Sequence, residues 1–186
     1  LHWHHFDSPI LPPTIPQDVY GKEHPLESKI LVYFPFESPE RIKEFLRPFR
    51  EFTFHIYTPG LRAPHEEGHL LWRPVSRQNF VEDLADCGGV MCNAGFSLLS
   101  EALHLGRKIL AKPVSGQVEQ KANALALRQL GLGSVMSRLD REATREWLCL
   151  DPPQPRNYPE VLPRVAEWIH EGPWDRPQEL ADRLWA

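Results

Sequence analysis

The chain has 186 residues, of which 41% are hydrophobic and 25% are charged, and its formal net charge at pH 7 is −4. These proportions are typical of a globular protein that can bury a sizeable core. The basic residues form no long run, which disfavours nucleic-acid binding because a phosphate backbone requires a clustered positive face. No apolar stretch approaches ~20 residues, so the sequence predicts no membrane-spanning helix.

The three cysteines, Cys87, Cys92 and Cys149, are odd in number and form no Cys-x-x-Cys pair. This usage favours buried, reduced thiols in a cytoplasmic protein over disulfides or a metal site. The chain begins without a methionine, within what looks like an arm, so we expect it to be a piece of a longer protein.

Residues 1–28 contain several prolines and show no hydrophobic periodicity, which predicts an extended linker or arm rather than a packed element. The histidines at positions 2, 4 and 5 could indicate a metal site, but no carboxylate or cysteine pattern completes one. We therefore interpret this stretch as an interdomain arm and predict no metal site.

A regular alternation of strands and helices follows the arm. Residues 29–36 form the continuous apolar run of a central parallel strand, and Ser38 and Pro39 mark the start of a helix over 39–49. Further strands are expected at 52–57, 69–75, 90–92, 109–111 and 133–136, a polar loop at 59–68, and helices at 79–87, 96–105, 117–131 and 141–148. This order predicts an α/β fold, a Rossmann-like parallel sheet with helices on both faces.

The expected domain organisation has three parts. A linker or arm covers residues 1–28, one Rossmann-like domain covers residues 29–150, and C-terminal helices fall within residues 151–186. The last part begins with a proline-rich break, after which amphipathic helices are expected at 158–170 and 177–185.

The chemistry is expected at the turn 93–95, which joins an apolar strand to an amphipathic helix. Small residues let a ligand approach the backbone, while the free N–H groups and the dipole of a helix N-terminus attract an anion such as a diphosphate. Glu101 lies about one and a half turns further along the helix and suits two vicinal hydroxyls, such as a ribose diol. Anion donors beside a diol acceptor indicate a nucleotide.

The stretch 88–124 resembles the nucleotide-sugar site in the C-terminal domain of GT-B glycosyltransferases. It is similar to the UDP-glycosyltransferases and to the N-acetylglucosaminyltransferase that completes the lipid-linked cell-wall precursor. Gly95 matches the turn glycine, Ser97 matches a position near the diphosphate, and Glu101 matches the ribose-binding glutamate. Glu119-Gln120 and Asn123-Ala124 match the sugar-contacting Asp-Gln pair and the Asn-Ala pair that follows it.

The resemblance implies the C-terminal half of an inverting, metal-independent enzyme that uses a nucleotide sugar, above all a UDP-sugar, and needs no cofactor. It implies that Val75 binds the base through backbone groups, while Asn93 stands where relatives often carry His or Arg and Glu119 stands in place of Asp. The substrate-binding residues that it implies are Val75, Asn93, Gly95, Phe96, Ser97, Glu101, Gln117, Glu119, Gln120 and Asn123.

Several of these residues also have purely structural interpretations. The interpretations that stay open are Glu101 as a surface carboxylate, Ser97 as a first-turn hydroxyl, Asn123 as a loop anchor, Gln117, Glu119 and Gln120 as ordinary helix-start residues, and Ser38 as an N-cap rather than a phosphate contact. No motif for a nucleophile or a metal is present. The catalytic base is unassigned, since the resemblance places it in an N-terminal domain that we expect to lie outside this chain.

Trp174 and Trp185 would suit contact with that missing domain, or with the sheet of this chain itself. The expected partners are therefore a nucleotide-sugar donor, an unknown acceptor and the missing N-terminal domain. Two rival functions remain: a nucleotide-sugar 2-epimerase, which the Glu119 carboxylate keeps open, and a non-catalytic interaction domain, which the departures at Asn93 and Glu119 motivate.

Overall fold

The computed structural model describes residues 9–21, 26–172 and 174–186. Within these residues it contains a seven-stranded sheet with the order β3-β4-β2-β1-β5-β6-β7. The strands are β1 (Leu26–Tyr33), β2 (Thr53–Thr58), β3 (His65–Glu67), β4 (Leu70–Pro74), β5 (Cys87–Cys92), β6 (Lys108–Ala111) and β7 (Ser134–Val135). All neighbouring strands pair in parallel except β3 and β4, which are antiparallel.

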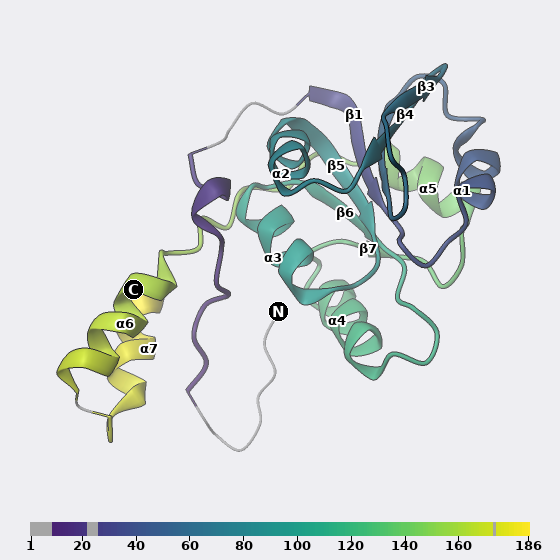
Figure 1. Ribbon diagram of the computed structural model, residues 1–186. Helices are drawn as coiled ribbons and strands as arrows, with labels where there is room; N and C mark the ends of the chain where they lie inside the picture. The colour runs from purple at the N-terminus through teal and green to yellow at the C-terminus, as the bar shows by residue number, and fades with distance from the viewer. Residues whose placement is uncertain (1–8, 22–25, 173) are drawn as a thin grey trace.

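Helices cover both faces of this sheet (Figure 1). They are η1 (Gln17–Val19), α1 (Pro39–Leu46), α2 (Arg77–Asp86), α3 (Phe96–His104), α4 (Val118–Gln129), α5 (Arg141–Leu148), α6 (Val161–Glu171) and α7 (Pro177–Trp185). The predicted Rossmann-like α/β fold is confirmed. The short edge strand β3 was missed, because its three polar residues lie inside the expected loop 59–68.

Alternate residues of the central strands pack into two separate hydrophobic cores, one on each face of the sheet. Leu31 and Val90 point into a core under α2, α3 and α4, whereas Ile30 and Val32 point into a core under α1 and α5. This alternation follows from the period of two along a strand. Apolar residues on both faces therefore give β1 the continuous run that predicted a buried strand.

The two adjacent glycines at the start of β5 allow close packing. A β-carbon at Gly89 would lie 2.8 Å from the Trp147 ring of α5, and one at Gly88 would lie 2.6 Å from the backbone of Glu27. Real side chains do not tolerate such distances, so these positions need glycine for packing. The indole of Trp147 can thus lie directly on the central strand.

Several predicted boundaries shift by a few residues. Helix α1 ends at Leu46 rather than at 49, because Pro48 has no backbone N–H with which to continue the intrahelical hydrogen bonds. Helix α2 begins at Arg77 rather than at 79, and β5 begins directly after α2 at Cys87. Helix α6 begins at Val161 rather than at 158.

Segment 9–21 packs on the domain, although its prolines predicted an extended arm. Val19 is fully buried and Ile15 is nearly so, both in the core under α2–α4. The Tyr20 hydroxyl donates to Pro159 O at 3.0 Å, and Trp185 Nε1 of α7 donates to Ile10 O at 2.7 Å. The expected histidine cluster lies in residues 1–8, outside the described residues.

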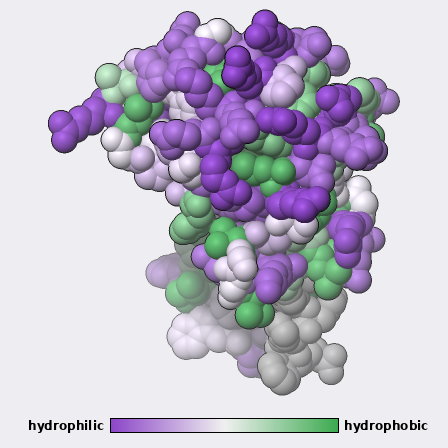
Figure 2. Space-filling view, turned by 90° about the vertical axis from the view of Figure 1, so that its right-hand side faces the viewer, coloured by the Kyte–Doolittle hydropathy of each residue, from purple (hydrophilic) through white to green (hydrophobic). Residues whose placement is uncertain are grey.

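Helices α6 and α7 stand beside the sheet rather than on it (Figure 1). They share a small apolar cluster of Val161, Leu180 and Leu184, with Leu11 packed against it. Trp174 remains exposed on this helical pair. The opposite side of the molecule is largely hydrophilic, with apolar side chains showing only in small areas (Figure 2).

The cysteines are free thiols, and two of the three are buried as predicted. Burial raises the pKa of Cys87 and of Cys92 to about 12. The prediction is wrong for Cys149, which is exposed at the end of α5. Among the helices of the described residues, none has the length and apolar character that crossing a membrane requires.

Candidate functional site

The turn between β5 and α3 presents a free helix N-terminus at the carboxyl edge of the sheet. The Gly95 backbone serves as N-cap without any side-chain cap, and the first intrahelical bond runs from Leu99 N to Gly95 O at 3.2 Å. The N–H groups of Phe96, Ser97 and Leu98 thus lack an intrahelical acceptor. With Ser97 exposed and Phe96 partly exposed on this turn, the arrangement suits an anion.

Gly95 itself has no structural reason to be glycine. Its φ of −74° is ordinary for any residue, and an added β-carbon would meet no atom of the described chain within 4 Å. This contrasts with Gly89, where packing excludes a side chain. The absence of a side chain at Gly95 leaves the backbone of this turn open to close approach.

Two asparagines hold this turn in place. Asn93 Nδ2 donates to Lys112 O at 2.7 Å, which ties the end of β5 to the end of β6. Asn123 Nδ2 of α4 donates to Ala94 O at 3.0 Å, and its side chain is fully buried. The burial supports the loop-anchor interpretation of Asn123, and its contact with a ligand stays a prediction.

The second loop, between β6 and α4, combines an anchor with exposed polar side chains. Gln120 Oε1 accepts from Val114 N at 2.9 Å and fixes the loop backbone. Gln117 and Glu119 are exposed at the start of α4. These two side chains are therefore accessible to a group bound at this edge, whereas Gln120 acts mainly on the loop.

Glu101 is not the surface carboxylate that one structural interpretation allowed. It is 5% exposed, and Arg77 Nη1 lies 3.3 and 3.4 Å from its two oxygens. Burial raises the pKa of the Glu101 carboxyl above its ordinary value, although Arg77 acts in the opposite direction. The carboxylate is thus held one and a half turns from the free helix N-terminus, facing the first turn of α2.

Sequence reasoning missed Arg77. Its guanidinium also binds Asp18 of η1, through Nε to Oδ2 at 3.0 Å and through Nη2 to Oδ1 at 2.8 Å. The available signal was its position, since Arg77 follows the carboxyl end of β4 by only a few residues. Val75, the expected contact of the base, lies at the same strand end and is 54% exposed.

A second missed pair crosses the end of β5. Lys112 Nζ lies 2.8 Å from Glu37 Oε1, and both side chains are largely buried. Ser38 beside it caps α1 by accepting from Arg41 N at 3.4 Å, which favours the plain N-cap interpretation. The sheet edge therefore has a largely buried ion pair beside the N-terminus of α1.

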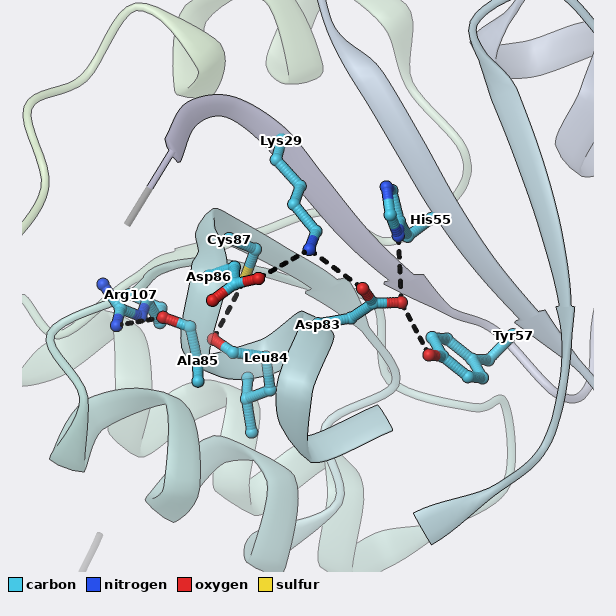
Figure 3. Close-up of polar contacts among 9 residues, drawn as sticks. All are labelled: Lys29, His55, Tyr57, Asp83, Leu84, Ala85, Asp86, Cys87 and Arg107. Carbon is cyan, nitrogen blue, oxygen red and sulfur yellow. Dashed lines mark hydrogen bonds and ion pairs between the residues drawn. The ribbon is translucent and has the colours of Figure 1, made fainter. Parts of the chain in front are cut away.

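Helix α2, which carries Arg77, is fixed by a polar cluster on its inner side (Figure 3). Asp83 Oδ1 lies 2.9 Å from Lys29 Nζ, and Asp83 Oδ2 accepts from the Tyr57 hydroxyl at 2.6 Å. His55 Nδ1 lies 2.9 Å from the same Oδ2, although the ring is not aligned for a good hydrogen bond. Burial alone would raise the pKa of Asp83, but these three partners hold it well below its usual range.

The end of α2 is fixed as well. Arg107 Nη2 donates to Ala85 O at 2.6 Å, so a cation meets the last carbonyls of the helix (Figure 3). The start of α2, with Arg77, is therefore part of a rigid element.

A family model of known proteins matches this chain. The family model described as glycosyl transferase family 1 matches residues 5–152, which is more than half of the chain. The chain belongs to glycosyl transferase family 1. No curated protein matches it.

Solved structures show the same fold. The glycotransferase of kitacinnamycin is similar with a TM-score of 0.57 and 15% identity, over 95% of this chain and 49% of that one. The calicheamicin glycosyltransferase CalG4 has a TM-score of 0.55 and 18% identity, over 74% of this chain and 38% of that one. SnogD, a glycosyltransferase from Streptomyces nogalater, has a TM-score of 0.51 and 20% identity, over 94% of this chain and 43% of that one.

Identities this low establish the fold alone. This chain spans less than half the length of each of these three chains. Together with the family match, they confirm the predicted resemblance to the C-terminal domain of GT-B glycosyltransferases.

Proposed function

We propose that this chain is the donor-binding part of a glycosyltransferase and that its donor is a UDP-sugar. The observation that carries the proposal is Gly95, a glycine that neither backbone conformation nor packing requires, at a free helix N-terminus. Glu101 lies further along the same helix as the acceptor for the ribose diol. Val75, at the end of β4, is the proposed backbone contact of the base.

The proposed chemistry is inverting transfer without a metal ion. When the bond between sugar and diphosphate breaks, negative charge develops on the leaving diphosphate. The N–H groups and the dipole at the start of α3 are oriented toward such an anion and would stabilise it. The base that deprotonates the acceptor, and the acceptor site itself, are proposed to come from a second domain outside this chain.

The sugar is proposed to lie over the start of α4. Gln117 and Glu119 are exposed there, and Gln120 fixes the loop before them. Asn93 and Asn123 then contribute by shaping the turn that receives the diphosphate. We expect this protein to act in the cytoplasm, on the basis of its free cysteines.

Calorimetric titration of this chain with UDP, with ADP and GDP as controls, tests the proposal. We expect weak binding that is selective for UDP and that is lost in Glu101→Ala. Turnover of a UDP-sugar by this chain alone is not expected, since the proposed base lies elsewhere. Absence of binding at millimolar UDP would overturn the proposal and favour a non-catalytic interaction domain.

A second candidate is a nucleotide-sugar 2-epimerase, favoured by the exposed Glu119 carboxylate beside the proposed sugar position. Chromatography of the sugar nucleotide after incubation separates the two. An epimerised sugar nucleotide would replace the transferase proposal with this second candidate.

A further inference from the structure

Arg77 lies between the carboxylates of Asp18 and Glu101 and contacts them with different geometries. Its Nε and Nη2 atoms form a two-pronged contact with Asp18 at 3.0 and 2.8 Å, the geometry in which a guanidinium binds a carboxylate most strongly. Its Nη1 atom is shared between the two oxygens of Glu101 at 3.3 and 3.4 Å. Asp18 therefore anchors Arg77, and Arg77 only aligns Glu101.

The shared contact leaves Glu101 able to bind a ligand. A carboxylate offers about four lone-pair sites, and a single nitrogen bridging both oxygens at these distances uses few of them. Glu101 is 5% exposed, and within the described residues its carboxylate has no hydrogen bond or ion pair besides the contact with Arg77. Burying a carboxylate costs free energy unless hydrogen-bond donors contact it. The two neighbouring hydroxyls of a ribose can donate one hydrogen bond to each carboxylate oxygen.

The alignment is rigid because α2 is rigid. Asp83 fixes the middle of the helix to β1 and β2, and Arg107 fixes its last turn (Figure 3). On the other side, Asp18 belongs to η1, which is held by the fully buried Val19. Two independent anchors thus converge on one guanidinium.

We propose that Arg77, anchored by Asp18, is a positioning residue that orients the Glu101 carboxylate toward the 2′- and 3′-hydroxyls of the donor nucleotide. This inference rests on the proposed function and deepens it in two ways. It makes segment 9–21 part of the donor site. It also makes recognition of a ribonucleotide over its 2′-deoxy form depend on a residue that does not touch the nucleotide.

The experiment compares UDP with 2′-deoxy-UDP by calorimetric titration of the wild type, Arg77→Gln and Asp18→Asn. The wild type is expected to prefer UDP. In Arg77→Gln we expect UDP affinity to fall about tenfold, which corresponds to about one oriented, charge-assisted contact. The affinity for 2′-deoxy-UDP should fall less, because this nucleotide offers Glu101 only its 3′-hydroxyl. Asp18→Asn should show the same pattern with a smaller loss. Arg77→Lys keeps the positive charge but cannot form the two-pronged contact with Asp18, so its UDP affinity should lie between those of the wild type and Arg77→Gln.

Arg164→Gln is the matched control, because Arg164 pairs only with the exposed Glu167 on α6 in the described chain. It should bind both nucleotides as the wild type does. Equal losses for UDP and 2′-deoxy-UDP in Arg77→Gln would indicate a general structural role and overturn the inference, as would unchanged UDP affinity. Failure of the wild type to bind UDP would instead refute the proposed function, and this inference with it.

If Arg77→Gln fails to fold, Asp18→Asn decides the question. Asp18 is exposed on η1, so its substitution is expected to leave the fold intact. Preference for UDP that survives fully in Asp18→Asn would contradict the anchoring of Arg77.

Discussion

Helix α2 connects two acidic sites whose surroundings differ. Asp83, in the middle of the helix, has contacts of 2.9 Å or less on both oxygens, from three partners. Glu101, beside the start of the helix, has one partner at 3.3 and 3.4 Å. The pKa of Asp83 is held well below its usual range, whereas burial raises the pKa of Glu101.

The difference separates a carboxylate with a structural role from the carboxylate that we propose to bind the donor. Asp83 is saturated by the protein, so it stabilises the fold and has little left to offer a ligand. Glu101 is buried with one shared partner, so in our proposal it retains lone pairs for the donors of a ligand. The predictions below test this contrast, in order of decreasing expected effect.

Asp83→Ala is expected to destabilise the protein by about 3 kcal/mol, because it leaves the Lys29 ammonium and the Tyr57 hydroxyl buried without their main partner. Urea unfolding followed by circular dichroism measures the change. Asp86→Ala is the matched control: Asp86 also contacts Lys29, at 3.3 Å, but is half exposed, so its loss should amount to less than about 1 kcal/mol. Similar losses in the two variants would refute the structural role of Asp83.

Glu101→Ala should behave in the opposite way. Nucleotide affinity is expected to fall by about 2 kcal/mol, which is roughly 30-fold, because a charged acceptor for the ribose is lost. The free energy of unfolding should change much less than in Asp83→Ala, since Glu101 has one partner at 3.3 and 3.4 Å and burial, which raises its pKa, disfavours its ionised form. Glu82→Ala, an exposed position on α2, is the control for both measurements. A large stability loss in Glu101→Ala with unchanged UDP binding would reverse the assignment.

Acid should distinguish the two carboxylates. A carboxyl whose pKa is lowered by folding contributes stability that is present above its unfolded pKa of about 3.9 and is lost as the pH falls toward its folded pKa. Asp83 should therefore make unfolding easier below about pH 4, by at most about 1.4 kcal/mol per pH unit. Asp83→Asn should flatten this part of the pH profile.

Glu101 has the opposite sign. Because folding raises its pKa, its ionisation lowers stability as the pH rises through the interval between the unfolded and the folded pKa. Glu101→Gln should remove that decline without changing the slope below pH 4. An identical pH profile in both variants and the wild type would contradict the difference between the two sites.

Tyr57→Phe is expected to produce the smallest effect. It removes only the 2.6 Å hydrogen bond to Asp83 and leaves Lys29 in place, so a loss of about 1 kcal/mol is expected in urea unfolding. Tyr33→Phe, on a partly exposed ring, is the control. A loss as large as that of Asp83→Ala would mean that Tyr57, rather than Lys29, dominates the cluster.

Local patterns carried most of the fold. The apolar run 29–36 and the Ser38-Pro39 cap identified β1 and α1 because burial and capping act on neighbouring residues. Strand β3 was not predictable, since its three residues are polar and it forms a strand only through antiparallel pairing with β4. The packing of Ile15 and Val19 was hidden for a similar reason, because it depends on a distant part of the chain.

In the candidate site too, features set by neighbouring residues were predictable, and contacts between distant residues were not. The turn glycine, the helix N-terminus and Glu101 follow one another along the sequence, so they could be proposed as a site from the local pattern together with the family resemblance. Arg77 and Asp18 meet Glu101 only in three dimensions, from two other elements. Nothing in the local pattern around either residue indicates that contact.

The glycine at position 95 has a consequence for how this protein can fail. At Gly89 any side chain collides with Trp147, so a substitution there would lower the amount of folded protein in the cell. At Gly95 a side chain meets open space in the described chain, so a substituted protein should accumulate normally. Selection at Gly95 would then act on activity alone. A protein substituted there would stay folded, so chaperones and proteases would not remove it.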